Sequence, residues 1–392
     1  MSLLTGNART DQVLSNKVAV DMRGNIDLLD DQRAYFEYLT RQFRGGTTPV
    51  DAMKYEFMEQ RAYPMTMTCT AISAAAATEV TCDVPSRAHT DQMVYNTRTE
   101  EWYLMDEAIG GTATSTTITV LNQSGSGGIT TATAIGDVLI VGPEAHAEGE
   151  AVPAAYSNTP SYLYTYLFQH DKRRANTDIQ RLSKEYGIKQ LILDRKIFWL
   201  GEMRALAMNM YTSKKGREVA SASGPRRHQM SGIMEQITTN VIDFDAVPGA
   251  LSLASIGEML RICKSHSASS SVKVGVCGQN AIAAVSAMPA AAIRTTVSET
   301  AWGKNLKTLV TPHSNLAVGY DPMLSDEYGM ADKFFILDPS YIERLELKGA
   351  PTHLLLNIQA SDDIHNQVDA ITGTDGLRLG LEELHAYAEN VA

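Results

Sequence analysis

The apolar positions between residues 188 and 211 recur every three or four residues, which is the spacing of one face of an α-helix. Six residues share this stripe: Leu193, Ile197, Leu200, Met203, Ala207 and Met210. Two lysines and Gly216 follow, which is a common way for a helix to end. At about 1.5 Å per residue, about 24 residues make a rod of about 36 Å. We expect this rod to be the spine of the fold.

Apolar and polar residues alternate instead in an earlier part of the chain, as they do in strands with one buried face. The segments 65–72 and 79–84 flank a run of alanines and predict a hairpin. Three further strands are expected: 94–105, 116–120 and 137–141. Short strands at this spacing predict an all-β module, either a small barrel or a sandwich.

Two of the four cysteines lie on the arms of this hairpin. If the turn is centred between Ala75 and Ala76, Cys69 stands directly opposite Cys82. The two thiols are then either half-buried and free or joined in a cross-strand disulfide, and the sequence leaves both open. Four scattered cysteines do not make a disulfide framework, and this usage favours synthesis in a reducing cytosol.

The first 29 residues are polar and aperiodic and predict an extended arm. A short helix is expected next, because Tyr35 or Phe36, Leu39 and Phe43 recur at helical spacing before a pair of glycines. An arm and one short amphipathic helix cannot bury themselves, so this segment needs another surface to pack against.

Helices and strands alternate in the second half of the chain, which is the order of a sheet covered by helices. Four elements are expected there: helix 255–265, strand 272–276, helix 280–288 and strand 307–311. The chain then ends in strands: 342–348, 352–358, 367–372 and 377–381. The complete order predicts an α+β fold.

Four aromatic residues share one face of a predicted strand before the long helix: Tyr162, Tyr164, Tyr166 and Phe168. Such a row can stack on nucleic-acid bases, but only His170 and the basic residues 172–174 lie near it. A packed or inter-subunit strand face is the favoured interpretation.

The net charge of −11 belongs to one stretch of the chain. Residues 55–171 contain fourteen acidic residues, three arginines and no lysine, whereas acidic and basic residues balance elsewhere. This imbalance marks a separate surface module and argues against a basic nucleic-acid-binding face. The uncharged stretches 108–136 and 274–293 are rich in small or polar residues, so we expect a soluble protein without a membrane span.

Motifs for catalysis and cofactor binding fail at defining positions. The Gly-Lys pair at 303–304 could end a phosphate-binding loop, but an asparagine follows where Ser or Thr is required. His146 and Glu148 fit half of a zinc deaminase motif, without its paired cysteines. Ser270 and Lys273 have S-x-x-K spacing without the partner motifs. We therefore expect no catalytic residue, cofactor or metal ion.

The order of elements resembles that of the major capsid proteins of tailed bacteriophages, which have the Hong Kong 97 fold. Four stretches carry this likeness in order along almost the whole chain. Residues 134–149 look like the strand that closes the β insertion in one branch of the family, and residues 230–240 look like the segment after the spine helix. Residues 332–345 look like the return strand, and residues 376–387 look like the closing strand.

The resemblance implies five parts in chain order: an N-terminal arm with a short helix (1–50), an extended loop with the acidic β insertion (51–155), a peripheral domain with the spine helix (156–245), an axial domain (246–324) and a β return into the peripheral domain (325–392). It also implies hexamers and pentamers that form an icosahedral virion capsid, assembled in the bacterial host cytoplasm. The implied partners are further copies of the chain, a portal, scaffolding or cement proteins, and packaged double-stranded DNA that is enclosed non-specifically.

Eight residues are candidates for contacts between subunits: Arg33, Phe36, Phe43, Lys54, Arg61, Glu148, Arg173 and Arg174. Some members of the family crosslink a lysine to an asparagine of a neighbour. Lys54 is the only lysine between Lys17 and Lys172 and lies at the base of the loop, so we expect no such crosslink.

Three other functions are consistent with parts of the sequence. An encapsulin-like bacterial nanocompartment has the same fold, although the large acidic insertion argues against it. A cytosolic hydrolase could assemble its Ser, His and Asp only in three dimensions. A sugar-binding surface module would use the β insertion and Trp102.

Overall fold

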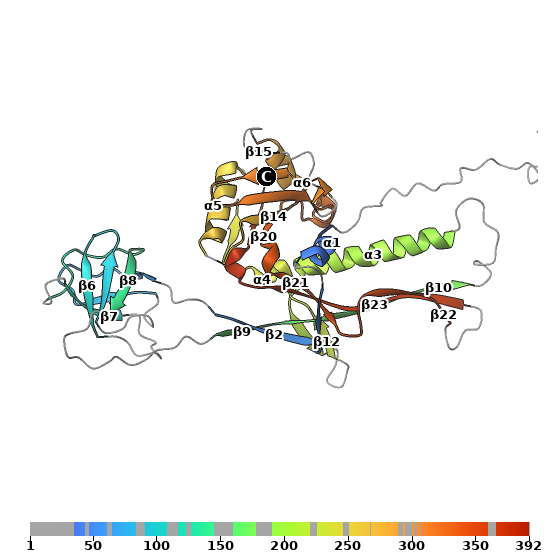
Figure 1. Cartoon of the computed structure of the whole chain (residues 1–392), viewed down its shortest axis with the longest axis horizontal. Coiled ribbons are helices and arrows are strands. Elements are labelled where there is room, and N and C mark those ends of the chain that lie inside the picture. Colours follow the sequence, from blue (N-terminus) through green and yellow to red (C-terminus); the bar gives the residue numbers. More distant parts are fainter. Residues whose placement is uncertain are drawn as a thin grey trace, which may run out of the picture. The chain divides into compact units, whose positions relative to one another are not determined.

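The structure is a computed structural model. It describes residues 35–43, 47–60, 65–83, 91–107, 117–122, 127–144, 160–177, 190–219, 226–245, 251–266, 268–288, 293–294, 300–301, 304–305, 307–359 and 366–391. The chain forms two compact units (Figure 1). The smaller comprises residues 58–162, and the larger contains the parts of the chain on either side of it.

The first layer of the larger unit is a five-stranded sheet. Its strands follow the order β1 (Thr47–Val50), β21 (Ile342–Leu347), β23 (Asn366–Leu379) and β10 (Phe168–Thr177), and β22 (His353–Gln359) also pairs with β23. Strands β1 and β21 are parallel, and the other pairs are antiparallel. Helix α3 (Gln190–Thr212) runs beside β23, and helix α1 (Tyr35–Gln42) contacts both α3 and β21 (Figure 1).

A seven-stranded mixed sheet forms the rest of the larger unit. Its order is β13 (Val241–Asp243), β24 (Ala386–Glu389), β20 (Phe334–Leu337), β14 (Val272–Cys277), β19 (Asn315–Tyr320), β18 (Lys307–Val310) and β15 (Ile293–Arg294). Helices α5 (Leu253–Lys264) and α6 (Gln279–Ser286) contribute buried apolar residues to the core beside it. Helix α5 begins at a Ser252–Ser255 capping box, which satisfies its first backbone N–H groups.

Smaller elements connect these layers. They are α4 (Ile233–Gln236), the hairpin of β11 (Gly216–Val219) and β12 (Arg226–Gln229), the pair β16 (Thr300–Ala301) and β17 (Lys304–Asn305), and the 3₁₀ turns η5 (Asp326–Tyr328), η6 (Pro339–Tyr341) and η7 (Glu382–Leu384).

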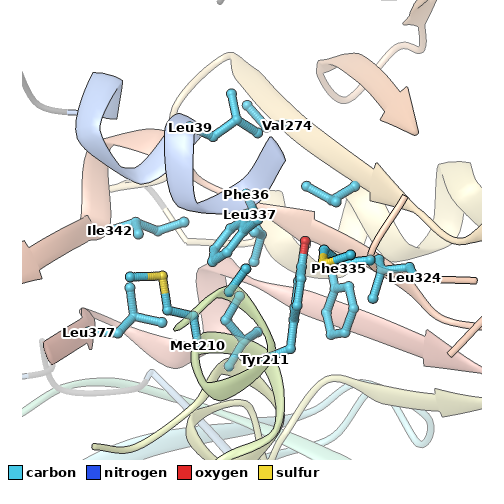
Figure 2. Packing of buried hydrophobic residues seen from close by; sticks show 14 of the residues in the cluster. Phe36, Leu39, Met210, Tyr211, Val274, Leu324, Phe335, Leu337, Ile342 and Leu377 are labelled. Carbon is cyan, nitrogen blue, oxygen red and sulfur yellow. The ribbon is translucent and has the colours of Figure 1, made fainter. Parts of the chain in front are cut away.

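The main core lies where α1, α3 and β20 meet (Figure 2). The ring of Phe36 lies 4.8 Å from that of Tyr211, and the Tyr211 ring lies 5.3 Å from Phe335. Leu39 and Met210 are fully buried beside them. Each such side chain contributes roughly 1.5–3 kcal/mol by leaving water, so α1 is held by ordinary core packing.

The smaller unit is a six-stranded antiparallel barrel. Its order is β3 (Thr66–Thr68), β8 (Val138–Glu144), β5 (Gln92–Asn96), β6 (Trp102–Glu107), β7 (Thr117–Asn122) and β4 (Glu79–Thr81). A single antiparallel bridge between Cys69 and Cys82 joins the first strand to the last and closes the barrel. The chain enters and leaves this unit through a two-stranded sheet of β2 (Lys54–Glu59) and β9 (Ser161–Tyr166).

The α+β class, the long helix and the all-β module agree with the sequence predictions. The predicted hairpin is confirmed at one residue pair, because Cys69 lies opposite Cys82 in an antiparallel bridge, whereas β3 otherwise pairs with β8 and β4 with β7. Three local predictions were wrong. The segment 94–105 is not one strand, because it contains parts of both β5 and β6, which pair with each other. The aromatic row is not one strand, because buried Leu167 separates β9 from β10. The last two predicted strands are the single strand β23. Gly373 lies within this strand, where Thr352 approaches so closely that a Cβ at position 373 would lie 2.2 Å from its hydroxyl oxygen.

Candidate functional site

Helix α1 is attached to the body of the larger unit by polar contacts as well as by its core residues. The backbone N–H of Phe36 donates to Asp321 Oδ2 at 3.0 Å, and the Tyr211 hydroxyl donates to the same oxygen at 2.8 Å. Asp321 is fully buried, so it satisfies one of the unpaired N–H groups in the first turn of α1. The surface that this helix was expected to need is therefore supplied by the same chain.

A fully buried arginine joins α1 to the sheet. The Arg344 guanidinium lies 2.5 and 2.8 Å from Asp375 Oδ1, through Nη2 and Nε, and its Nη1 pairs with Glu37 of α1. Glu346 lies 3.4 Å away. Although burial alone would lower the pKa of Arg344, the charges of Asp375 and Glu37 raise it above the usual value. Removing one member would leave an uncompensated buried charge.

The same cluster continues to β10 and α3 through His170. Its Nε2 lies 3.0 Å from Asp375 Oδ2, and its Nδ1 lies 3.5 Å from Glu202 Oε1. Lys172 Nζ lies 2.6 Å from the other oxygen of Glu202. Burial alone would lower the pKa of His170, but Asp375 and Glu202 raise it to about 9. His170 is therefore protonated at neutral pH and links the sheet to α3 as a cation.

The residues with S-x-x-K spacing have structural partners. The Ser270 hydroxyl donates to Asp338 Oδ1 at 2.9 Å, and Lys273 Nζ lies 3.2 Å from Asp338 Oδ2 and 2.8 Å from the Leu384 carbonyl oxygen. His385 accepts from the Asp338 N–H at Nδ1 and lies 3.2 Å from the Gly380 carbonyl through Nε2. Burial lowers the pKa of His385 to about 4. This group ties the C-terminal segment to β14 and β20.

Helix α3 exposes apolar residues in one half only. In its C-terminal half, residues 202–211, six side chains are buried, whereas residues 191–201 contain none. Ile192 is 60% exposed and Ile197 is 45% exposed. Exposed apolar residues that are grouped on one element are typical of an interaction surface.

Polar contacts hold this exposed half in place. Arg195 pairs with Asp369 of β23 at 2.8 Å and donates to the Asn357 side-chain oxygen of β22 at 2.7 Å. Arg174 of β10 pairs with Asp194. The orientation of the half-helix is thus fixed by the sheet, while Ile192 and Ile197 remain in contact with solvent.

Strand β22 adds to this exposed region. Leu355, Leu356 and Ile358 are each more than one third exposed, and they flank Asn357, which receives the hydrogen bond from α3. Asn357 has a positive φ of 57° at the point where the pairing register with β23 shifts. We call the five exposed residues Ile192, Ile197, Leu355, Leu356 and Ile358 the α3–β22 surface, which is a set of exposed side chains on two connected elements and not one continuous patch.

Five of the eight residues predicted to contact other subunits lie in the described part of the chain, and they have different surroundings. Phe36 and Phe43 are buried in the chain's own core, so in this structure they pack within the subunit. Arg174 is partly covered beside Asp194, and the Arg173 side chain is 71% exposed with Asp171 at 3.2 Å. Lys54 pairs with Glu56, and its ammonium lies 4.6 Å from the centre of the Tyr164 ring. Arg33, Arg61 and Glu148 lie outside the described residues.

The sequence analysis did not identify the α3–β22 surface, although a signal was present. Leu191, Ile192, Phe198 and Trp199 are apolar but lie off the predicted stripe. A helix that is apolar on all sides is expected to be covered on all sides.

In the described part of the chain, no helix combines the length and apolar character needed to cross a bilayer. His, Cys, Asp and Glu side chains do not gather there in a group of three suited to a metal ion.

Residues 10–392 match the family model described as SU10 major capsid protein. No individually curated protein matches the chain significantly. Among solved structures, the capsid of an empty GTA particle is 9% identical, with 98% of each chain covered and a TM-score of 0.50. A chain from Mycobacterium phage Bobi is 8% identical over 98% of this chain and 99% of its own, with a TM-score of 0.48. The SrpI encapsulin of Synechococcus elongatus PCC 7942 is 12% identical over 60% of this chain and 78% of its own, with a TM-score of 0.42.

Proposed function

We propose that this chain, which belongs to the SU10 major capsid protein family and therefore forms capsid shells from copies of itself, assembles as hexamers and pentamers into an icosahedral shell around double-stranded DNA. Assembly in the bacterial host cytoplasm, a portal, and scaffolding or cement proteins are part of this proposal. The five-part division of the chain, from the arm at 1–50 to the β return at 325–392, belongs to it as well.

The observation that carries the proposal is the uncovered α3–β22 surface. The Arg195–Asp369 ion pair holds α3 against the sheet, and the apolar side chains of this surface remain exposed to water. In a family whose members form shells from a single chain, the occupant of such a surface is a second copy. Burying Ile192 and Ile197 there would contribute about 25 cal/mol for each Å² removed from water.

Charge supports the enclosure of DNA without specific binding. The excess of acidic residues lies in residues 55–171, and the remainder of the chain is balanced. Attraction to a polyanion scales with the number of phosphates that lysines and arginines neutralise. A shell with little net positive charge would release its packaged DNA without first breaking many such contacts.

Among the predicted contact residues, Lys54 and Arg173 are exposed and can reach a neighbour. We include both in the proposed interface, together with Arg174, and keep Arg33, Arg61 and Glu148 as candidates from the sequence. Phe36 and Phe43 would act indirectly, by fixing α1 on the subunit body.

The proposal is tested by the particle mass of Ile197→Asp. We expect wild-type protein to form particles of megadalton mass, whereas the variant stays as folded subunits or small oligomers, measured by light scattering and negative-stain microscopy. Ile197→Leu, which keeps the apolar surface, is the matched control and should assemble. Normal shells from Ile197→Asp would overturn the proposed role of this surface.

The enclosed cargo is tested separately. Particles purified from infected cells should contain double-stranded DNA that resists external nuclease. Particles that enclose protein and no nucleic acid would instead indicate a nanocompartment.

A further inference from the structure

Among the described residues, the barrel of the smaller unit is closed at one position. Strands β3 and β4 have three residues each, and their ladders run to β8 and β7. The two strands meet through the bridge between Cys69 and Cys82, immediately beyond their last paired residues. The closure of the barrel therefore depends on one residue pair.

The backbone places these two cysteines in the geometry of a cross-strand disulfide. The N–H of Thr70 donates to the Thr81 carbonyl at 3.0 Å, and the N–H of Asp83 donates to the Thr68 carbonyl at 2.9 Å. These two bonds flank Cys69 and Cys82, which makes them a non-hydrogen-bonded pair. In such pairs the Cα atoms are about 4.5 Å apart and the side chains lie close on the same face. Disulfides span about 4.4–6.8 Å between Cα atoms.

Both side chains point into the barrel core. Cys69 and Cys82 are buried among Met67, Val80 and other apolar residues, and both are free thiols in this structure. A hydrogen bond from the Cys82 thiol lowers the pKa of Cys69 below its usual value, against the opposing effect of burial. The same contact and burial raise the pKa of Cys82. Cys69 is therefore the better nucleophile of the two.

We propose that Cys69 and Cys82 are a thiol-oxidation site, at which a small-molecule disulfide such as oxidised glutathione converts the two thiols into a bond that locks the barrel closed. The Cys69 thiolate attacks one glutathione sulfur and releases glutathione thiolate, which takes up the Cys69 proton. The Cys82 sulfur then attacks Cys69 and releases the second glutathione, which takes up the Cys82 proton. Two protein thiols are oxidised and one small disulfide is reduced to two thiols.

Access to the buried pair comes from local opening. The bridge is a single pair at the ends of two short strands, so this part of the barrel opens at lower cost than the longer ladder of β5 and β8. The pair stays reduced in a reducing cytosol and oxidises after release into an oxidising medium. The proposal does not depend on shell assembly.

The test is performed on the full chain, with and without oxidised glutathione, followed by denaturation and alkylation. We expect the oxidised protein to lose two of its four alkylatable thiols. A non-reduced peptide map should join the peptides that contain Cys69 and Cys82 within one chain. Four alkylatable thiols after prolonged exposure, or a bond between two chains, would overturn the proposal.

Two variants and one further measurement complete the design. The double variant Cys263→Ser, Cys277→Ser is the matched control and should still form the bond, because these cysteines lie in the core of the larger unit. Cys82→Ala should stop at a mixed disulfide on Cys69. If it does not fold, the wild-type map alone decides the outcome. The locked barrel should melt at a temperature on the order of 10 °C higher, reversibly with dithiothreitol, and an unchanged melting temperature would show that the bond does not stabilise the barrel.

Discussion

The two halves of α3 are similar in apolar content but differ in what covers them. Residues 202–211 pack beneath α1 and against Phe335 of β20, and the side chains of Met210 and Tyr211 are fully buried (Figure 2). Residues 191–201 are held by ion pairs to β10 and β23 and leave Ile192 and Ile197 exposed. The apolar pattern of a helix therefore does not by itself show which of its residues the subunit's own fold covers.

The largest expected effect comes from removing the charge of Arg344, which anchors α1 over the buried half of α3. Arg344→Met leaves Glu37 and Asp375 buried without their shared partner. We expect the subunit to lose about 3–5 kcal/mol of unfolding free energy, measured by urea denaturation. Arg173→Met, at an exposed position, should change it by less than about 0.5 kcal/mol. Similar midpoints for the two variants would show that Arg344 does not secure α1.

A smaller loss is expected from truncating the buried half of α3 itself. Leu206 is 2% exposed, so Leu206→Ala should cost about 2–5 kcal/mol through lost burial and the cavity it leaves. If Leu206→Ala leaves the denaturation midpoint unchanged, the buried half does not carry the stability assigned to it.

The junction of the two halves should make stability depend on pH. Glu202, at the start of the buried half, faces His170, whose pKa is raised from 6.5 to about 9 in the folded chain. Its contribution is therefore complete below pH 6.5 and is lost as the pH rises through about 9. We expect wild type to lose on the order of 2 kcal/mol more than His170→Gln across this interval. His353→Gln, at an exposed position, is the control and should follow wild type.

The smallest effect on the isolated subunit is expected in the exposed half. Ile192→Ala should change the unfolding free energy by less than about 0.5 kcal/mol, because its side chain is already largely in water. Its effect should be found in assembly instead, as a higher protein concentration needed to form shells. A large loss of subunit stability with unchanged assembly would reverse the assignment of the two halves.

Local sequence patterns were sufficient to predict those elements whose own residues carry the helical or strand spacing. The long helix α3, most of the barrel strands and the opposition of Cys69 and Cys82 follow from the spacing of neighbouring residues. The main strand partners did not follow, because the ladder of β4 runs to the distant β7 and β4 meets the nearer β3 only through the bridge between Cys69 and Cys82. The close approach of Thr352 to Gly373 also joins two separate segments, so local spacing could not predict it.

The candidate site was less accessible from sequence than the fold. Arg344, Glu37 and Asp375 are distant in the chain and carry no motif, so their meeting depends on the complete tertiary structure. The exposure of Ile192 likewise depends on which distant residues pack beside it, and its neighbours in the sequence do not show this. The function was predicted from the family resemblance, whereas the exposed residues of the proposed interface were identified only in the structure.

We propose that a second copy of the chain covers the exposed half of α3 in the shell. The decisive measurement is a reconstruction of assembled particles by electron cryomicroscopy, at a resolution that shows side chains. We predict that a neighbouring subunit lies against Ile192 and Ile197 and excludes water from both. Both side chains facing solvent in every subunit of the closed shell would contradict the account.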